Sequence, residues 1–109
     1  MSDFYEEILR ATATSEPSGV IRLTSTQNEV LLHTVPQEFA KSIEVKITPD
    51  AREDSPIKPV FEVTILDIAL DSVRSHGGVV TSRHFVSNGL KHHDVLDPDG
   101  NVIQLRSHN

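Results

Sequence analysis

The chain has 109 residues and a formal net charge of −6, and 37% of its residues are hydrophobic, which suits one domain with one modest core. It contains no cysteine, so disulfides, thiolate metal sites and a cysteine nucleophile are excluded. The negative charge disfavours nucleic-acid binding, and the sequence has no apolar run long enough to span a membrane. We therefore expect a cytoplasmic protein that binds neither nucleic acid nor membranes.

The first half of the chain is predicted to form a helix and three strands. Residues 3–12 carry apolar side chains at helical spacing, with Asp3 as the expected N-cap and Glu6 as its capping-box partner. Residues 14–19 have the composition of a loop. Alternating apolar and polar residues then predict strands over residues 20–24, 30–35 and 42–47.

The second half is predicted to begin with a strand over residues 60–65. Asp67 is placed to cap a following helix, and Gly77 is placed to close that helix in a left-handed conformation. The same alternation of side chains predicts three further strands, over residues 79–85, 92–96 and 102–106.

The polar segment 50–56 is bounded by prolines and is predicted to link the two halves of a single domain, residues 1–49 and 57–109. The second half repeats the order of elements in the first half, with one strand added at its front. Such a repeat of elements predicts two stacked copies of one supersecondary unit.

The last two predicted strands are joined by a tight turn, Asp97-Pro98-Asp99-Gly100-Asn101. Together with the strand at 60–65, the helix after Asp67 and the pair Gly77-Gly78, this turn resembles the second module of the vicinal oxygen chelate superfamily, which includes glyoxalases, bleomycin resistance proteins and extradiol dioxygenases. The resemblance implies an α+β fold of tandem βαβββ modules, the first lacking its opening strand. These modules would form a cupped mixed sheet with helices on its convex side.

Strand alternation predicts which side chains face the cup. Five polar residues are expected there and are our candidates for ligand binding: Arg22, Glu44, Glu62, Gln104 and Arg106. The alternative for Glu44 and Glu62 is that they are half-exposed strand residues paired with cations such as Arg106.

Metalloenzymes of the superfamily take one ligand from the first strand and one from the last strand of each module. The resemblance assigns Glu44 and Gln104 to two of these four positions and Val60 to a third, and the fourth lies on the missing strand. Because one carboxylate and one amide are too few ligands for a catalytic ion, we expect no metal cofactor. A divalent metal at Glu44 and Gln104 is the alternative.

Histidines are the other candidate ligands. His92 and His93 precede Asp94, but adjacent residues on a strand point to opposite faces, so only one of the two histidines can face the cup. His33 lies in an apolar strand and is expected to be a hydrogen-bonded core residue. His76 is expected to be structural, because it lies at a helix C-terminus.

Three functions are consistent with these patterns. The first is a metal-independent small-molecule binding protein of the glyoxalase/bleomycin-resistance type, and the second is a divalent-metal-dependent lyase, isomerase or dioxygenase. The third is a degenerate module that serves protein interaction. Because a missing strand leaves an exposed sheet edge, we also expect a homodimer in which the partner covers that edge or completes the cup.

Overall fold

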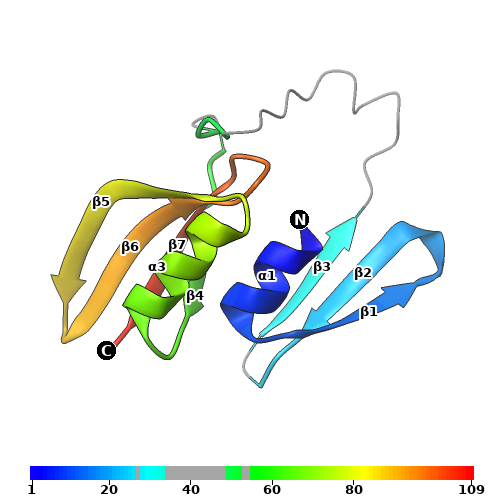
Figure 1. Ribbon diagram of the computed structural model, residues 1–109, viewed down its shortest axis with the longest axis horizontal. Helices are drawn as coiled ribbons and strands as arrows, with labels where there is room; N and C mark the ends of the chain where they lie inside the picture. The colour runs from blue at the N-terminus through cyan, green and yellow to red at the C-terminus, as the bar shows by residue number, and fades with distance from the viewer. Residues whose placement is uncertain (27, 34–48, 53–54) are drawn as a thin grey trace.

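A computed structural model describes residues 1–26, 28–33, 49–52 and 55–109. Within these residues the chain forms an α+β structure of two α-helices and seven strands in two sheets, together with one 3-10 helix (Figure 1). The elements are α1 (Ser2–Leu9), β1 (Thr12–Glu16), η1 (Pro17–Gly19), β2 (Val20–Thr24), β3 (Glu29–His33), β4 (Val60–Glu62), α3 (Leu66–Ser75), β5 (Val79–Ser87), β6 (Leu90–Leu96) and β7 (Val102–Ser107).

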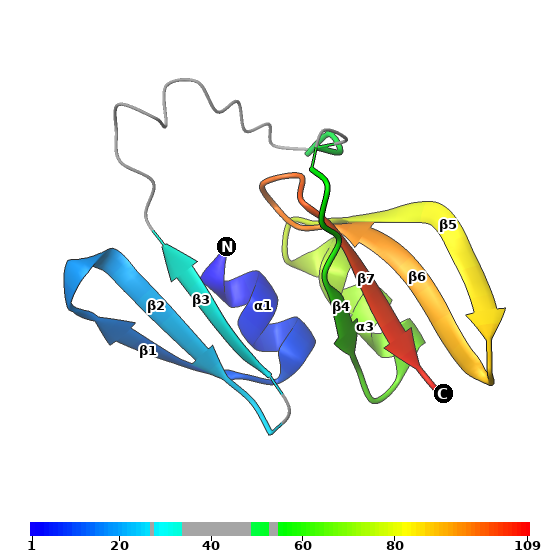
Figure 2. The same ribbon diagram turned by 180° about the vertical axis from the view of Figure 1, so that it is seen from behind.

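The two sheets are built alike except for one strand. Sheet A has the order β1-β2-β3 and is antiparallel. Sheet B has the order β4-β7-β6-β5, in which β4 runs parallel to β7 and the other pairs are antiparallel. Figure 2 shows that β3 and β4 are the edges through which the sheets approach each other. The second half is therefore a βαβββ module, and the described part of the first half has no counterpart of β4.

Both helices lie on the same side of the sheets, α1 against sheet A and α3 against sheet B (Figures 1 and 2). The helices also contact each other, so that one hydrophobic core runs through both halves. Each large apolar side chain buried in it contributes about 1.5–3 kcal/mol. The core consists of Phe4, Tyr5, Ile8, Leu9, Leu23, Leu66, Ala69, Leu70, Val73, Val95, Ile103 and Leu105. Within the described residues, neither helix has the length and apolarity needed to cross a membrane.

The start of the chain departs from the prediction at two places. The first helix ends at Leu9 instead of residue 12, because Arg10 adopts a left-handed conformation with φ of 50°. Residues Thr12–Glu16, mostly predicted as loop, form the edge strand β1. Ala13 is the one apolar residue of this strand, and it is only partly buried against the core. The sequence therefore shows no alternation of apolar and polar residues, and the strand is defined by its backbone pairing with β2.

The two predicted helix N-caps are wrong. Met1 is the N-cap of α1 and Asp3 lies in its first turn, while the Glu6 carboxylate accepts a 2.9 Å hydrogen bond from the Ser2 hydroxyl. Ile65 is the N-cap of α3, and Asp67 again lies in the first turn. A carboxylate in this position still favours the helix through the helix dipole.

The other boundaries are close to those predicted. The strand β2 has the predicted limits, and Gly77 follows the C-cap of α3 with a φ of 87° as expected. The strand β4 is shorter than predicted and ends at Glu62. The strand predicted over residues 42–47 lies outside the described residues.

The closing turn between β6 and β7 is tied to the segment that precedes β4. The Arg52 backbone N–H donates to the Gly100 carbonyl at 2.9 Å, and the Arg52 Nε–H donates to the Asp99 carbonyl at 2.7 Å. Gly100 has a φ of 86°, a conformation that favours glycine. Part of the predicted linker is therefore held against the hairpin.

Candidate functional site

The candidate site lies on the face of sheet B that points away from α3, here called the cup face. In β7, Ile103 and Leu105 are buried in the core, so Gln104 and Arg106 belong to the cup face as predicted. The antiparallel register of β6 and β7 places Asp94 beside Gln104 and His92 beside Arg106. The second predicted face of the cup, on sheet A, includes Arg22.

A cavity of about 570 Å³ lies over the cup face. Its floor comes from β5, β6 and β7, and its wall comes from described residues before β4, namely Ala51, Arg52, Ser55, Ile57 and Lys58. The polar residues that line it are Arg52, Ser55, Lys58, Thr81, Arg83 and Asp94. This volume falls within the range of ligand pockets, roughly 300–1,000 Å³.

Asp94 is the most buried polar residue in the cavity, with an exposure of 4%. Its carboxylate accepts hydrogen bonds from the Lys58 ammonium group at 3.0 Å and from the Gln104 Nε2 at 3.0 Å. The Thr81 hydroxyl donates to the Asp94 backbone carbonyl at 2.6 Å. These contacts satisfy a buried charge that would otherwise be costly, and they attach Lys58 to the floor of the cavity.

The hydrogen bonds fix the orientation of Gln104 and His92. Because the ionised Asp94 carboxylate only accepts hydrogen bonds, the Gln104 NH2 group faces it and the Gln104 Oε1 faces the His92 Nδ1, at 3.0 Å. An amide oxygen also only accepts, so the His92 Nδ1 carries a proton. The His92 ring stacks on Phe85 with centroids 4.4 Å apart. His92 is therefore the histidine of the pair that faces the cup.

His93 points to the opposite face, as the alternation of a strand requires. Its Nε2 donates to the Thr81 carbonyl at 2.6 Å, and its ring stacks on His84 with centroids 5.3 Å apart. The expectation for His33 is wrong, because this side chain is exposed at the end of β3. His76 is at the C-cap of α3, where its Nδ1 lies 2.9 Å from the Ser72 carbonyl.

Two of the predicted ligand-binding residues form a pair at one end of the cup face. The Arg106 guanidinium donates to the Glu62 carboxylate at 2.8 Å, and both side chains are about half exposed. This contact is the alternative that the sequence left open for Glu62. Gln104 is adjacent on the same face but is buried, with 7% exposure.

Arg22 lies in sheet A and contacts none of these residues. It forms ion pairs with Glu16 at 2.6 Å and with Glu29. The hydrogen bond from Arg22 lowers the pKa of Glu16, and the same bond raises the pKa of Arg22. Arg22 is thus committed to a surface ion-pair cluster. Glu44, the fifth predicted residue, lies outside the described residues.

The described residues at the superfamily's metal positions do not suit a divalent ion. Val60 pairs with Gln104 across β4 and β7, and Gln104 has both amide atoms in hydrogen bonds. In sheet A, the residue of β3 that corresponds to Gln104 is Leu31. It lies between Val30 and Leu32, which pack against the core, just as Gln104 lies between Ile103 and Leu105, and a leucine side chain cannot bind a metal ion. No group of three or more His, Asp or Glu residues that could hold an ion occurs in the part of the chain that the structure describes.

Sequence reasoning missed Lys58, Thr81 and Arg83. Lys58 belongs to a proline-rich stretch that shows no periodicity, and a register shift between Val80 and His84 interrupts the alternation around Thr81 and Arg83. In the sequence, Asp94 follows two histidines directly. Its place two residues after His92 on a strand is the signal that puts both on one face.

No protein-family model and no curated protein matches the sequence. Solved structures do match. A glyoxalase/bleomycin resistance protein/dioxygenase family enzyme from Burkholderia phytofirmans PsJN is 13% identical with a TM-score of 0.69, and the match covers 100% of this chain and 88% of that one. The fosfomycin resistance protein FosX from Listeria monocytogenes is 12% identical with a TM-score of 0.67, covering 99% and 81%.

An integron cassette protein from the mobile metagenome of V. cholerae is 23% identical to this chain with a TM-score of 0.62, and the match covers 99% of this chain and 84% of that one. At these identities the similarity establishes a common fold and not a common activity.

Proposed function

We propose that this chain, which has the fold of the vicinal oxygen chelate superfamily, is a small-molecule binding protein that holds its ligand in the cavity of sheet B without a metal ion. The observation that carries the proposal is the cavity of about 570 Å³ over the cup face. A volume in the range of ligand pockets on that face favours ligand binding over a degenerate module, in which the cup would be filled. Polar side chains in the same lining, among them Thr81 and Arg83, add support, because polar groups in a pocket orient ligands.

The proposal is tested by NMR titration of the full chain with a panel of four small probes: pentanoate, butylphosphonate, pentylammonium and pentanamide. We expect at least one probe to shift backbone amide signals of β5, β6 and β7 in a saturable way. Val102→Phe places a ring in the cavity and should abolish these shifts, because Val102 is half-buried in its lining. Val86→Phe, at a side chain with 71% exposure outside the cavity, is the matched control. Absence of any saturable shift would contradict the proposal.

We also infer a homodimer in which the partner covers the edge of β3 that faces sheet B. Among the described residues, β2 is the strand that pairs with β3, and no described strand pairs with the other edge of β3. A groove of about 420 Å³ lies beside this edge, and its apolar lining includes Ile21, Leu31 and Phe61. Open strand edges and apolar grooves are features that proteins cover by association.

Sedimentation of the protein at micromolar concentration tests this inference. We expect a dimer that Leu31→Glu weakens at least tenfold, because Leu31 lines the groove and is 43% exposed. Val86→Glu, on the far strand of sheet B, should leave the dimer intact. A stable monomer of the unmodified chain would refute the dimer and leave the ligand proposal standing.

A further inference from the structure

We propose that the cavity of sheet B selects a small organic anion, a carboxylate or phosphonate on a short aliphatic body, and that Arg83 is the residue that recognises its charge. This inference rests on the proposed function and specifies its ligand class. It follows from the charges of the described lining, from their partners and from the apolar part of the wall.

The described residues of the cavity lining carry more positive than negative charge, opposite in sign to the chain as a whole. Within the residues that the structure describes, three basic side chains, Arg52, Lys58 and Arg83, line it together with one carboxylate, that of Asp94. The whole chain has a formal net charge of −6. Because a concave surface of one sign concentrates counter-ions of the other sign, the described lining attracts anions that the rest of the surface repels.

The partners of these groups show which charge is available. Asp94 is held by Lys58 and Gln104, so it does not compete for a ligand's counter-charge. Arg22, Arg74 and Arg106 each form an ion pair with a carboxylate outside the cavity.

The Arg83 side chain differs from these arginines. Within the part of the chain that the structure describes, its guanidinium has no ion pair and no hydrogen bond, while the Arg83 backbone N–H donates to the Thr81 hydroxyl. A guanidinium group presents a planar fork of donors that binds both oxygens of a carboxylate or phosphonate. Arg83 is therefore the cation of the lining that can form a bidentate contact without breaking an existing one.

The apolar lining defines the rest of the ligand. Ile57, Leu96 and Val102 line the same cavity as Arg83. A free inorganic anion would leave these side chains without a contact, whereas a chain of a few methylene groups would bury them at a gain of about 0.8 kcal/mol per CH2. An anion with an aliphatic body satisfies both parts of the lining.

The probe panel separates this inference from the proposed function. We expect pentanoate or butylphosphonate to bind at least tenfold more tightly than pentanamide, and pentylammonium to bind more weakly than pentanamide. Inorganic phosphate should bind more weakly than butylphosphonate. The comparison of pentanoate with butylphosphonate identifies the head group, since both share the anionic chemistry proposed here.

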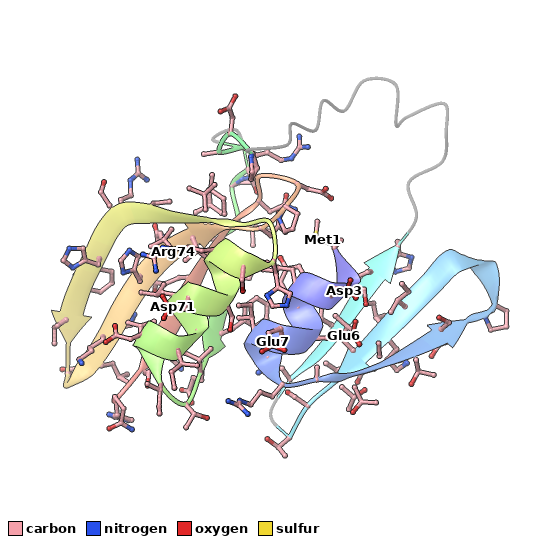
Figure 3. All side chains as sticks on the ribbon, viewed as in Figure 1. Met1, Asp3, Glu6, Glu7, Asp71 and Arg74 are labelled. Carbon is pink, nitrogen blue, oxygen red and sulfur yellow. The ribbon has the colours of Figure 1, made fainter. Side chains whose placement is uncertain are left out.

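Arg83→Gln should reduce the affinity for the anions at least tenfold and leave the affinity for pentanamide unchanged. Arg83→Lys should restore part of the affinity, because it keeps the charge and loses the fork. Arg74→Gln is the control, since Arg74 lies on α3 beside Asp71, outside the cavity (Figure 3). The inference would be overturned if pentanamide or pentylammonium bound as tightly as the anions, or if Arg83→Gln kept the full affinity for the anions. Either result would leave the proposed function standing. If no probe binds, the proposed function fails together with the inference.

Discussion

The Tyr5 hydroxyl donates a 2.6 Å hydrogen bond to the carboxylate of Asp97, although the two residues are 92 positions apart. Asp97 is almost fully buried, and its carboxylate also accepts from the backbone N–H groups of Asp99 and Asn101 and from the Asn101 side chain. The first helix is thus fastened to the closing turn of the last hairpin. One aspartate both shapes that turn and joins the two halves of the chain.

Replacing Tyr5 by Phe should lower the free energy of unfolding by about 1–3 kcal/mol, the usual loss when a buried hydrogen-bond partner is removed. Burial, and then the charge of Asp97, raise the pKa of Tyr5 above its ordinary value. Because the pKa of Tyr5 is higher in the folded than in the unfolded state, the protonated hydroxyl stabilises the fold fully below the unfolded-state pKa of about 10. This stabilisation is lost as the pH rises toward the pKa of the folded state. Urea denaturation from neutral to alkaline pH should therefore show a decline in stability that Tyr5→Phe removes.

Tyr5 is the one tyrosine of the chain, and the chain has no tryptophan. Phenolate absorbance therefore reports this residue alone, and in the folded protein it should rise only at a pH above the ordinary range for tyrosine. An ordinary titration of Tyr5, or an unchanged alkaline decline in Tyr5→Phe, would contradict the buried contact.

Gly100→Ala should destabilise the protein more than Gly89→Ala. Both glycines have positive φ, 86° and 76°, so each substitution carries the cost of a left-handed residue, about 1–2 kcal/mol. A Cβ at Gly100 would lie 2.1 Å from the Asp50 carbonyl oxygen, whereas a Cβ at Gly89 meets nothing within 4 Å. Urea denaturation should show an additional loss of at least ~1 kcal/mol for Gly100→Ala. Equal losses would mean that the segment at Asp50 does not cross this turn.

Lys58→Met should lower stability by about 1–2 kcal/mol, because it leaves the buried Asp94 without its cation. The figure is below that of a fully buried pair, since the Lys58 side chain is 43% exposed and solvent screens it. Arg74→Met, which breaks the exposed pair with Asp71, is the control and should cost about 0–0.5 kcal/mol. Thermal denaturation measures both, and a neutral Lys58→Met would show that Asp94 does not need this partner.

Dialysis against a chelator should leave the melting temperature unchanged, and added Mn²⁺, Ni²⁺ or Zn²⁺ should not raise it. A bound ion stabilises the folded state in proportion to its occupancy, so a melting temperature that rises with metal concentration would refute metal independence. Gln104→Glu provides a sharper test, because it adds a carboxylate at one metal position. We expect it to remain insensitive to metal, since Val60 is its neighbour across the sheet.

The sequence was informative where one face of an element is buried. The limits of β2 follow from Ile21 and Leu23, which pack on the core at every second position. The same alternation predicted correctly that Gln104 and Arg106 share a face. β1 was missed because its strand character comes from backbone pairing with β2 and not from burial.

The site could be predicted only in part, because its contacts join distant segments. The Lys58–Asp94 pair spans 36 positions, and Lys58 comes from a stretch without periodicity. Arg22 has the right alternation for the cup but is engaged by Glu16 and Glu29 in its own sheet. Alternation determines a side chain's face, whereas its partners depend on the packing of whole sheets.

The parallel pairing of β4 with β7 has a consequence for the order of folding. β5, β6 and β7 follow one another through short turns, so their pairing closes only small loops, whereas β4 must find β7 across the length of α3, β5 and β6. Closing the longer loop costs more entropy, and we expect β4 to dock last. Lys58 arrives with β4, so the cavity is completed in that final step. A bound ligand should then slow amide hydrogen exchange in β4 more than in the hairpins. Filling of the cavity would thus stabilise the strand that docks last.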